Sequence, residues 1–296
     1  MARSSYPLFL ILLGVAAALA ALPSVWSGFH GDDYIVFGVL SGALRKLYPS
    51  RLDVFNFCDG TADHVRRMVD VGILPWWTAD TFRVAFWRPL SALTHWLQRN
   101  RRSPVQGTWR WLATVAVCIL MGLHLLVSPY QLFRIASESD DRTDERVADS
   151  ISTDPSLRGQ GLIIMSAPTT VLVFHWFFVR ALRGQPIPEY TRLLASGPVS
   201  LELYRPDSRS VRVRWRGHQE PGFGVSRPFA VGERIRLAST DVEITATDTM
   251  GWPSEAVFRF DVNLDDPRLR WVTWDGDEGR FTQLAPPRIG ATSVVP

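Results

Sequence analysis

The stretch SVRVRWRG (210–217) alternates apolar and charged side chains along its length. Such alternation is typical of a β-strand with one buried face, because successive side chains point to opposite sides of a sheet. The pattern recurs in five further runs: SLELYRP (200–206), ERIRLAS (233–239), DVEITATD (241–248), AVFRFDV (256–262) and LRWVTWD (269–275). Turns rich in Asp, Ser, Gly and Pro bound these runs. The C-terminal region is therefore predicted to be an antiparallel sandwich or small barrel.

Just upstream, the apolar stretch 162–179 contains Pro168, which would interrupt a continuous helix. It predicts a buried strand over 161–167, a turn at Pro168 and an amphipathic helix over 170–183. A transmembrane helix is the alternative, because an apolar run of this length is also a membrane signal. Residues 161–296 are predicted to form a soluble, β-rich α/β domain, with residues 134–160 as a polar linker before it.

Two longer apolar stretches lie in the N-terminal half. The first, PLFLILLGVAAALAALPSVW (7–26), is about 20 residues long and would span about 30 Å as a helix, the thickness of a bilayer core. Residues 1–26 are predicted to be an N-terminal transmembrane anchor and residues 108–133 a second transmembrane helix. Cleavage of the first stretch as a signal peptide is the alternative, and it would give a secreted soluble protein.

These segments predict an integral protein of the inner (plasma) membrane, with α-helical anchors followed by an α/β C-terminal domain whose β-rich part is mostly antiparallel. Residues 27–107 are predicted to be an amphipathic extracytoplasmic loop, with a short helix over 63–71 that ends at Gly72. The positive-inside rule conflicts between the two anchors, because Arg3 places the N-terminus in the cytoplasm while Arg99, Arg101 and Arg102 place the start of the second anchor there too. Either one assignment is wrong or the membrane part of the chain is incomplete.

The composition excludes some classes of function. The formal charge is only +3, and the arginines alternate with acidic residues rather than forming the basic blocks that nucleic-acid binding requires. The two cysteines offer no disulfide framework, since Cys118 lies in an apolar run and Cys58 in a polar loop. Cys58 lacks an identifiable base nearby, so it is predicted to be a small buried residue rather than a nucleophile.

The most suggestive polar group is the pair Asp32 and Asp33, with His30 close by. Adjacent carboxylates repel each other, and such a pair could act as a general base towards a hydroxyl or hold a divalent cation. An acidic turn in a solvated loop is the alternative reading.

Arg88 and His95 are the other candidate pair. They are seven residues apart: Arg88 directly precedes a helix predicted over 89–97, and His95 lies within it. After about two helical turns the two side chains lie on one face. Arginine suits phosphate or carboxylate, and histidine could share a proton. The alternative is an arginine that reaches the membrane interface and an interfacial histidine.

Three motifs resemble a known family: Gly28-Phe29-x-x-Asp32-Asp33-Tyr34, Gly72-Ile73-Leu74-Pro75-Trp76-Trp77 and Phe86-Trp87-Arg88-Pro89-Leu90-Ser91. They are similar to the start of bacterial multi-span GT-C glycosyltransferase-like proteins, relatives of lipid-linked sugar and protein mannosyltransferases. The C-terminal region resembles the soluble tail of the same proteins. The central spans of that family have no counterpart in this chain.

The resemblance implies a transferase that uses a polyprenyl-phosphate sugar as donor at a membrane, often with a divalent cation. It places the catalytic centre at Asp32 and Asp33, and it gives Tyr34, Arg88 and His95 as substrate-binding candidates. Because two anchors cannot enclose a lipid-linked donor, the chain is predicted to be a shortened homologue that transfers no sugar alone. The alternative function is a non-catalytic envelope protein whose β-domain binds a partner.

Overall fold

The computed structural model describes residues 34, 35, 38, 39, 44, 47, 48, 56–85, 143–217 and 228–296. Residues 31–86 and 144–296 belong to one compact unit. The other unit comprises residues 1–30 and 87–143, almost all of which lie outside the described residues. This compact unit therefore combines a segment from the N-terminal half of the chain with residues 144–296.

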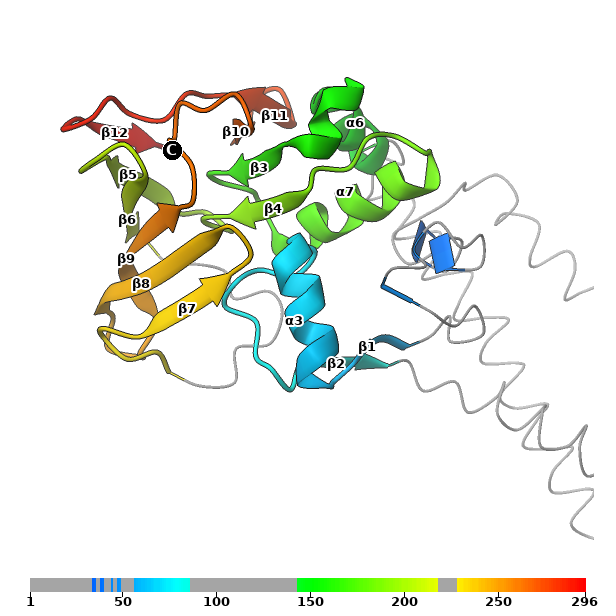
Figure 1. Ribbon diagram of the computed structural model, residues 1–296, viewed down its shortest axis with the longest axis horizontal. Coiled ribbons are helices and arrows are strands. Elements are labelled where there is room, and N and C mark those ends of the chain that lie inside the picture. Colours follow the sequence, from blue (N-terminus) through cyan, green and yellow to red (C-terminus); the bar gives the residue numbers. More distant parts are fainter. Residues whose placement is uncertain are drawn as a thin grey trace, which may run out of the picture. The chain divides into compact units, whose positions relative to one another are not determined.

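The largest element is a six-stranded antiparallel sheet with the strand order β12-β5-β6-β9-β8-β7 (Figure 1). The strands are β5 (Ser200–Tyr204), β6 (Ser210–Arg216), β7 (Arg234–Leu237), β8 (Thr240–Thr247), β9 (Pro253–Phe260) and β12 (Thr292–Val295). The alternating runs at residues 200–262 form strands as predicted, because one side of every strand is buried and the other faces solvent.

A second sheet has the order β11-β10-β3-β4 and is mixed rather than antiparallel. Its strands are β3 (Gly161–Ile164), β4 (Tyr190–Leu193), β10 (Leu269–Asp275) and β11 (Arg280–Gln283). The run at 269–275 was expected in the antiparallel unit, but it pairs in parallel with β3. Alternation reports burial and not strand direction, so the sequence could not distinguish these pairings.

The predicted strand and helix between 161 and 183 are confirmed. Strand β3 is followed by α7 (Thr170–Leu182), and the helix returns the chain to the parallel strand β4. Arg180, completely buried on α7, donates hydrogen bonds to the carbonyl oxygens of Ala148, Ile151 and Ser152 at 2.8–2.9 Å. This arginine holds the end of α6 (Thr143–Ser150), and the chain that leads on to the 3-10 helix η1 (Pro155–Gly159), against α7.

The N-terminal segment 56–85 folds around α3 (Ala62–Val71), which β1 (Asn56–Asp59) and β2 (Arg83–Ala85) flank as an antiparallel pair. A helix ending at Gly72 was predicted and is confirmed. Thr61 caps the first turn by accepting a hydrogen bond from the His64 amide, and Gly72 ends the helix at φ 89°. That conformation favours glycine, which has no β-carbon to clash.

Arg192 on β4 joins this segment to the C-terminal region. The side chain is 2% exposed and donates hydrogen bonds to the carbonyl oxygens of Val69 and Asp70 at the end of α3, and to that of Ala238 between β7 and β8. The Asp70 carboxylate in turn accepts a hydrogen bond from the Ala238 amide at 3.0 Å. The C-terminus of α3 and the β7–β8 turn are thus fixed to the same arginine.

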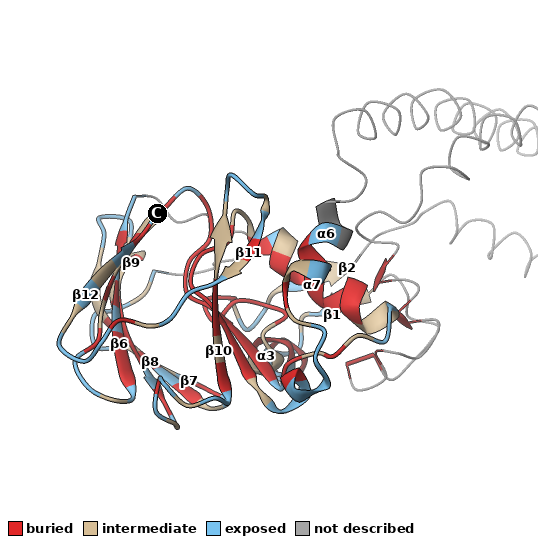
Figure 2. Cartoon of the chain, turned by 90° about the horizontal axis from the view of Figure 1, so that it is seen from above, coloured by how far each residue is buried: buried red, intermediate tan, exposed pale blue. Residues whose placement is uncertain are grey.

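Aromatic side chains fill the space between segment 56–85 and the six-stranded sheet. The ring of Trp76 lies 5.7 Å from Phe258, 6.0 Å from Phe229 and 6.3 Å from Trp215. Buried and more exposed residues alternate along β5, β6 and β8 (Figure 2), and Trp215 and Phe258, which contact Trp76, are among the buried ones. The opposite side of this sheet is therefore its solvent-exposed face.

The predicted fold class, helical membrane anchors followed by an α/β domain, is wrong for the part of the chain that the structure describes. That part is mostly β-sheet, arranged in three sheets, and none of its helices is long and apolar enough to cross a membrane. Its longest helix, α7, has 13 residues and would reach only about 20 Å. The proposed anchors at 1–26 and 108–133 lie outside the described residues.

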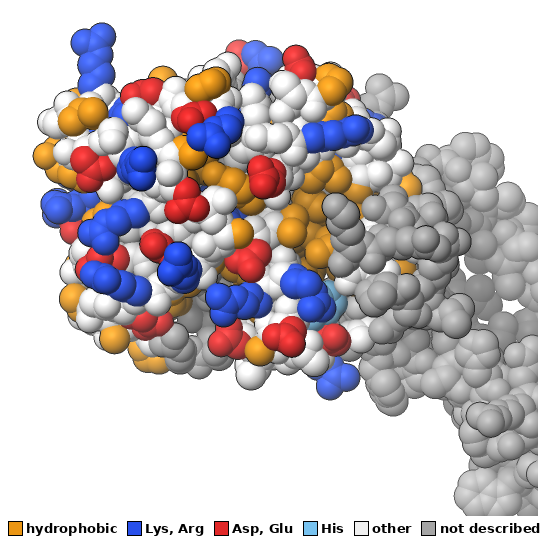
Figure 3. Space-filling model, viewed as in Figure 1, with side chains coloured by type: hydrophobic (Ala, Val, Ile, Leu, Met, Phe, Trp, Pro, Cys, Tyr) orange, Lys and Arg blue, Asp and Glu red, His pale blue; other side chains and the backbone are white. Residues whose placement is uncertain are grey.

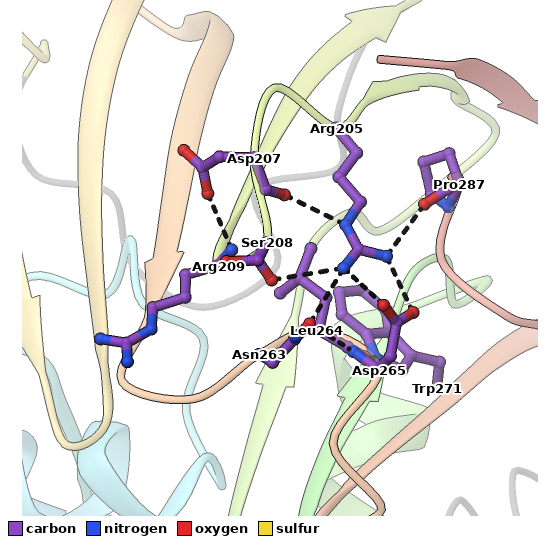
Figure 4. Close-up of polar contacts among 9 residues, drawn as sticks. All are labelled: Arg205, Asp207, Ser208, Arg209, Asn263, Leu264, Asp265, Trp271 and Pro287. Carbon is purple, nitrogen blue, oxygen red and sulfur yellow. Dashed lines mark hydrogen bonds and ion pairs between the residues drawn. The ribbon is translucent and has the colours of Figure 1, made fainter. Parts of the chain in front are cut away.

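Arg205, at the loop that follows β5, is the centre of a polar network that Figure 4 shows in detail. Its guanidinium forms two parallel hydrogen bonds with the Asp265 carboxylate, at 2.8 and 2.7 Å. It also donates to the Asn263 side chain at 3.0 Å and to the carbonyl oxygens of Asp207 and Pro287. This network ties the β5–β6 loop to the segments before β10 and before β12.

The Arg205–Asp265 pair predicts a pH-dependent contribution to stability. Hydrogen bonds from Arg205 keep the pKa of the Asp265 carboxyl below its ordinary value, although partial burial raises it. A lowered folded pKa stabilises the fold above the unfolded pKa of about 4, and this contribution is lost as the pH falls through the folded pKa. We expect Asp265→Asn to be less stable than wild type near neutral pH, with the difference shrinking in acid.

The measurement is the free energy of urea unfolding of the full chain from about pH 6 to about pH 3 for both proteins. A difference between them that stays constant over this range would show that ionisation of Asp265 does not contribute.

Candidate functional site

Four of the five predicted site residues, Asp32, Asp33, Arg88 and His95, lie outside the described residues. Tyr34 is described and is 4% exposed, as part of the hydrophobic core. A ring so deeply buried presents almost no surface for a substrate to contact. The described part of the chain therefore does not assemble the predicted site, and its roles remain predictions.

Asp59 and His64 form a pair that the sequence prediction missed. The Asp59 carboxylate accepts hydrogen bonds from the amide and hydroxyl of Thr61, at 2.8 and 2.7 Å, and lies 3.3 Å from His64 Nδ1. Burial raises the pKa of this carboxyl, but the Thr61 hydrogen bonds and the nearby His64 outweigh it and lower the pKa overall. The pair completes the cap at the start of α3.

Neighbouring Cys58 is buried, as predicted, and its thiol donates a hydrogen bond to the Phe82 carbonyl at 3.1 Å. Burial also raises the pKa of this thiol, which disfavours the reactive thiolate. The cluster of Cys58, Asp59 and His64 thus has a structural role, and nucleophilic catalysis is not supported there. Among the described residues, no three His, Cys, Asp or Glu side chains are grouped to hold a metal ion.

The most distinctive chemical feature is the exposed face of the six-stranded sheet, which we call the arginine face. It carries six arginines and four carboxylates on neighbouring strands. These residues are Arg212, Arg214, Arg216, Arg234, Arg236, Arg259, Glu202, Asp241, Glu243 and Glu255. Figure 3 shows basic and acidic side chains intermingled over the region of β7, β8 and β9.

Strand register explains how the charges on this face are matched. Arg214 lies opposite Glu255 on β9, and its guanidinium donates to that carboxylate at 2.7 Å. Arg216 binds Glu202 on β5, and hydrogen bonds from this arginine keep the pKa of the Glu202 carboxyl below its ordinary value. Opposite charges on neighbouring strands stabilise a sheet only slightly when exposed. The excess of two arginines leaves the face weakly positive.

A hollow of about 210 Å³ lies on this face at the edge of the sheet. Its lining comes from β7, β8 and β9: Arg234, Arg236, Asp241, Val242, Glu243, Val257 and Arg259. Glu243 lies between two arginines, 3.4 Å from Arg234 and 3.1 Å from Arg259. The side chains of Arg234 and Arg236 are 72% and 86% exposed, so a ligand could reach them from solvent.

The sequence contained a signal for this face. The alternation that predicts strands β6 and β7 places arginine at every outward position of Arg212-Val213-Arg214-Trp215-Arg216 and of Arg234-Ile235-Arg236. Only the pairing of these strands in one sheet shows that the arginines share a face.

No family model matches the chain, and neither a curated protein nor a solved structure is similar to it.

Proposed function

We propose that this chain is a non-catalytic interaction protein whose arginine face binds an acidic glycan of the cell envelope. The observation that carries the proposal is the clustering of six arginines on one exposed sheet face, with only four carboxylates among them. Arginine guanidinium groups have several donors in a planar fork, which suits the carboxylate, sulfate or phosphate groups of such a polymer.

The arrangement of the charges favours an extended ligand over a compact one. The arginines lie on three strands, β6, β9 and β7, of a sheet whose neighbouring strands are about 4.8 Å apart, and β8 between β9 and β7 carries carboxylates. Each guanidinium is already near a carboxylate, so a single small anion gains little. A polymer that bears repeated charges can contact several arginines at once, and each weak contact adds to the others.

The test compares binding of the fluorescently labelled full chain to polygalacturonate, an acidic polysaccharide, and to neutral dextran. We expect binding to polygalacturonate only, weakening with added salt as exposed charges are screened. The double variant Arg212→Glu/Arg214→Glu should bind about tenfold more weakly, because it reverses two charges on the face.

Arg268→Glu is the matched control, because Arg268 is an exposed arginine in the loop before β10 and not on the face. Its affinity should stay within about twofold of wild type. Equal binding to dextran, or an undiminished affinity in the double variant, would contradict the proposal.

A second candidate is the shortened GT-C-type glycosyltransferase homologue that uses a polyprenyl-phosphate sugar. The observation that favours it is the packing of segment 56–85, which follows the acidic motif in the chain, with residues 144–296 in one compact unit. Segments that fold into one unit lie on the same side of a membrane. The acidic loop and the soluble tail of a GT-C-type enzyme would have to do the same to form one site.

A transferase assay with a panel of lipid-linked sugar donors separates the two candidates. Since the resembled enzymes enclose the donor between many helices, we expect no sugar transfer by this chain alone. Donor-dependent turnover that Asp32→Asn or Asp33→Asn abolishes would establish the second candidate in place of the first.

A further inference from the structure

The hollow on the arginine face differs chemically from the rest of that face. Val257 faces outward between Arg212 on β6 and Glu243 on β8, and it gives the hollow an apolar floor. It is only 8% exposed, and it is one of the residues that line the hollow. The valine offers only a small apolar contact, so a ring-shaped ligand in the hollow would touch it with one side while most of its contacts are to the charged groups of the rim.

The rim of the hollow offers both kinds of hydrogen-bonding group. Arg234, Arg236 and Arg259 supply N–H donors, while Asp241 and Glu243 supply carboxylate acceptors. A simple oxyanion can use only the donors, and it is repelled by Glu243, which lies within 3.4 Å of both Arg234 and Arg259. A hydroxyl group both donates and accepts, so neighbouring hydroxyls of a sugar can bridge an arginine and a carboxylate.

Contacts with β4 and α3 hold the strands that line the hollow in place. Strands β7 and β8 are joined by a tight turn in which Ser239 has φ 64°, a conformation that is uncommon for a residue with a side chain. Arg192 and Asp70 bind the carbonyl and the amide of Ala238 in that turn. The hairpin that carries four of the rim side chains is therefore fixed before any ligand arrives, which lowers the entropic cost of binding.

We propose that this hollow is a saccharide subsite, in which one sugar residue packs on Val257 and its hydroxyls bind Arg259, Arg234 and Glu243. The inference rests on the proposed function, since it assigns a single residue of the bound glycan to a defined place on the face. It also extends that function, because a subsite of this kind recognises sugar hydroxyls and so accepts a neutral sugar residue.

The experiment measures binding of the full chain to a panel of labelled tri- and tetrasaccharides, neutral and uronic, with inorganic phosphate as competitor. At least one oligosaccharide should bind, and Glu243→Gln and Arg259→Gln should each weaken it by about tenfold, because each removes a charged partner of a sugar hydroxyl. Arg268→Gln, outside the arginine face, should change this affinity by less than about twofold. Circular dichroism of each variant verifies that the sheet is intact.

The sign of the Glu243→Gln effect separates the subsite from the wider face. Removing this carboxylate makes the face more positive, so binding of polygalacturonate through charge alone should become stronger. Weaker oligosaccharide binding together with stronger polymer binding supports both proposals. Loss of affinity for the acidic polymer in the face variants, without any oligosaccharide binding, overturns the subsite and leaves the proposed function intact. Competition by phosphate, with stronger binding in Glu243→Gln, shows a simple anion site and also overturns the subsite.

Discussion

Replacement of Gly72 by alanine should destabilise the described unit by about 3 kcal/mol or more, combining backbone strain with overpacking. Gly72 has φ 89°, and a β-carbon at this position would lie 2.0 Å from the Thr191 carbonyl oxygen on β4. A backbone atom cannot move aside as a flexible side chain can. Relief therefore requires α3 to move away from β4, which would break the hydrogen bonds between Arg192 and the end of the helix.

Urea unfolding of the full chain, followed by tryptophan fluorescence, measures this effect. Gly184→Ala is the matched control, because Gly184 also has a positive φ of 64° but a β-carbon there would meet nothing within 4 Å. It should cost only about 1 kcal/mol, the strain of the left-handed conformation alone. Equal losses in the two variants would mean that the close approach of α3 and β4 does not matter for stability.

Local sequence pattern predicted much of the secondary structure and little of its assembly. Alternation identified the strands between residues 200 and 275, and Pro168 and Gly72 correctly marked boundaries near β3, α7 and α3. These signals work because each depends on a residue's own backbone preference or on the burial of one strand face. The helical anchors predicted at 1–26 and 108–133 lie outside the described residues, and none of the described helices is long and apolar enough to cross a membrane.

What the sequence could not provide were contacts between distant residues. Nothing in LRWVTWD (269–275) indicates that it pairs with β3, more than 100 residues earlier in the chain. Likewise, Arg192 occurs in a short run, Tyr190-Thr191-Arg192-Leu193, that shows no sign that its arginine is buried. The arginine face could not be predicted for the same reason. Each of its strands shows alternation, but only the register between strands brings the charged side chains together.

Burial of Arg192 leads to the other large expected effect, because Arg192→Met should destabilise the unit by about 4 kcal/mol. Methionine fills much of the same volume, so the loss comes from the carbonyl oxygens of Val69, Asp70 and Ala238, which lose their shared donor. Burial lowers the pKa of the Arg192 guanidinium to about 10, although Tyr190 and Asp70 raise it. The group therefore stays protonated at neutral pH, and the interaction with the negative end of α3 is that of a full charge.

Two comparisons make this prediction specific. Arg268→Met removes an exposed arginine whose partner, Asp266, is only two residues away, and it should cost less than about 1 kcal/mol. Arg192→Lys keeps the charge but not the planar fork that reaches α3 and the β7–β8 turn together, so most of the loss should remain. Hydrogen exchange should then show faster exchange both for the α3 amides and for the β7–β8 amides in Arg192→Met, since one side chain fixes both. Faster exchange in only one of these elements would show that Arg192 does not link the N-terminal segment to the hairpin that carries the hollow.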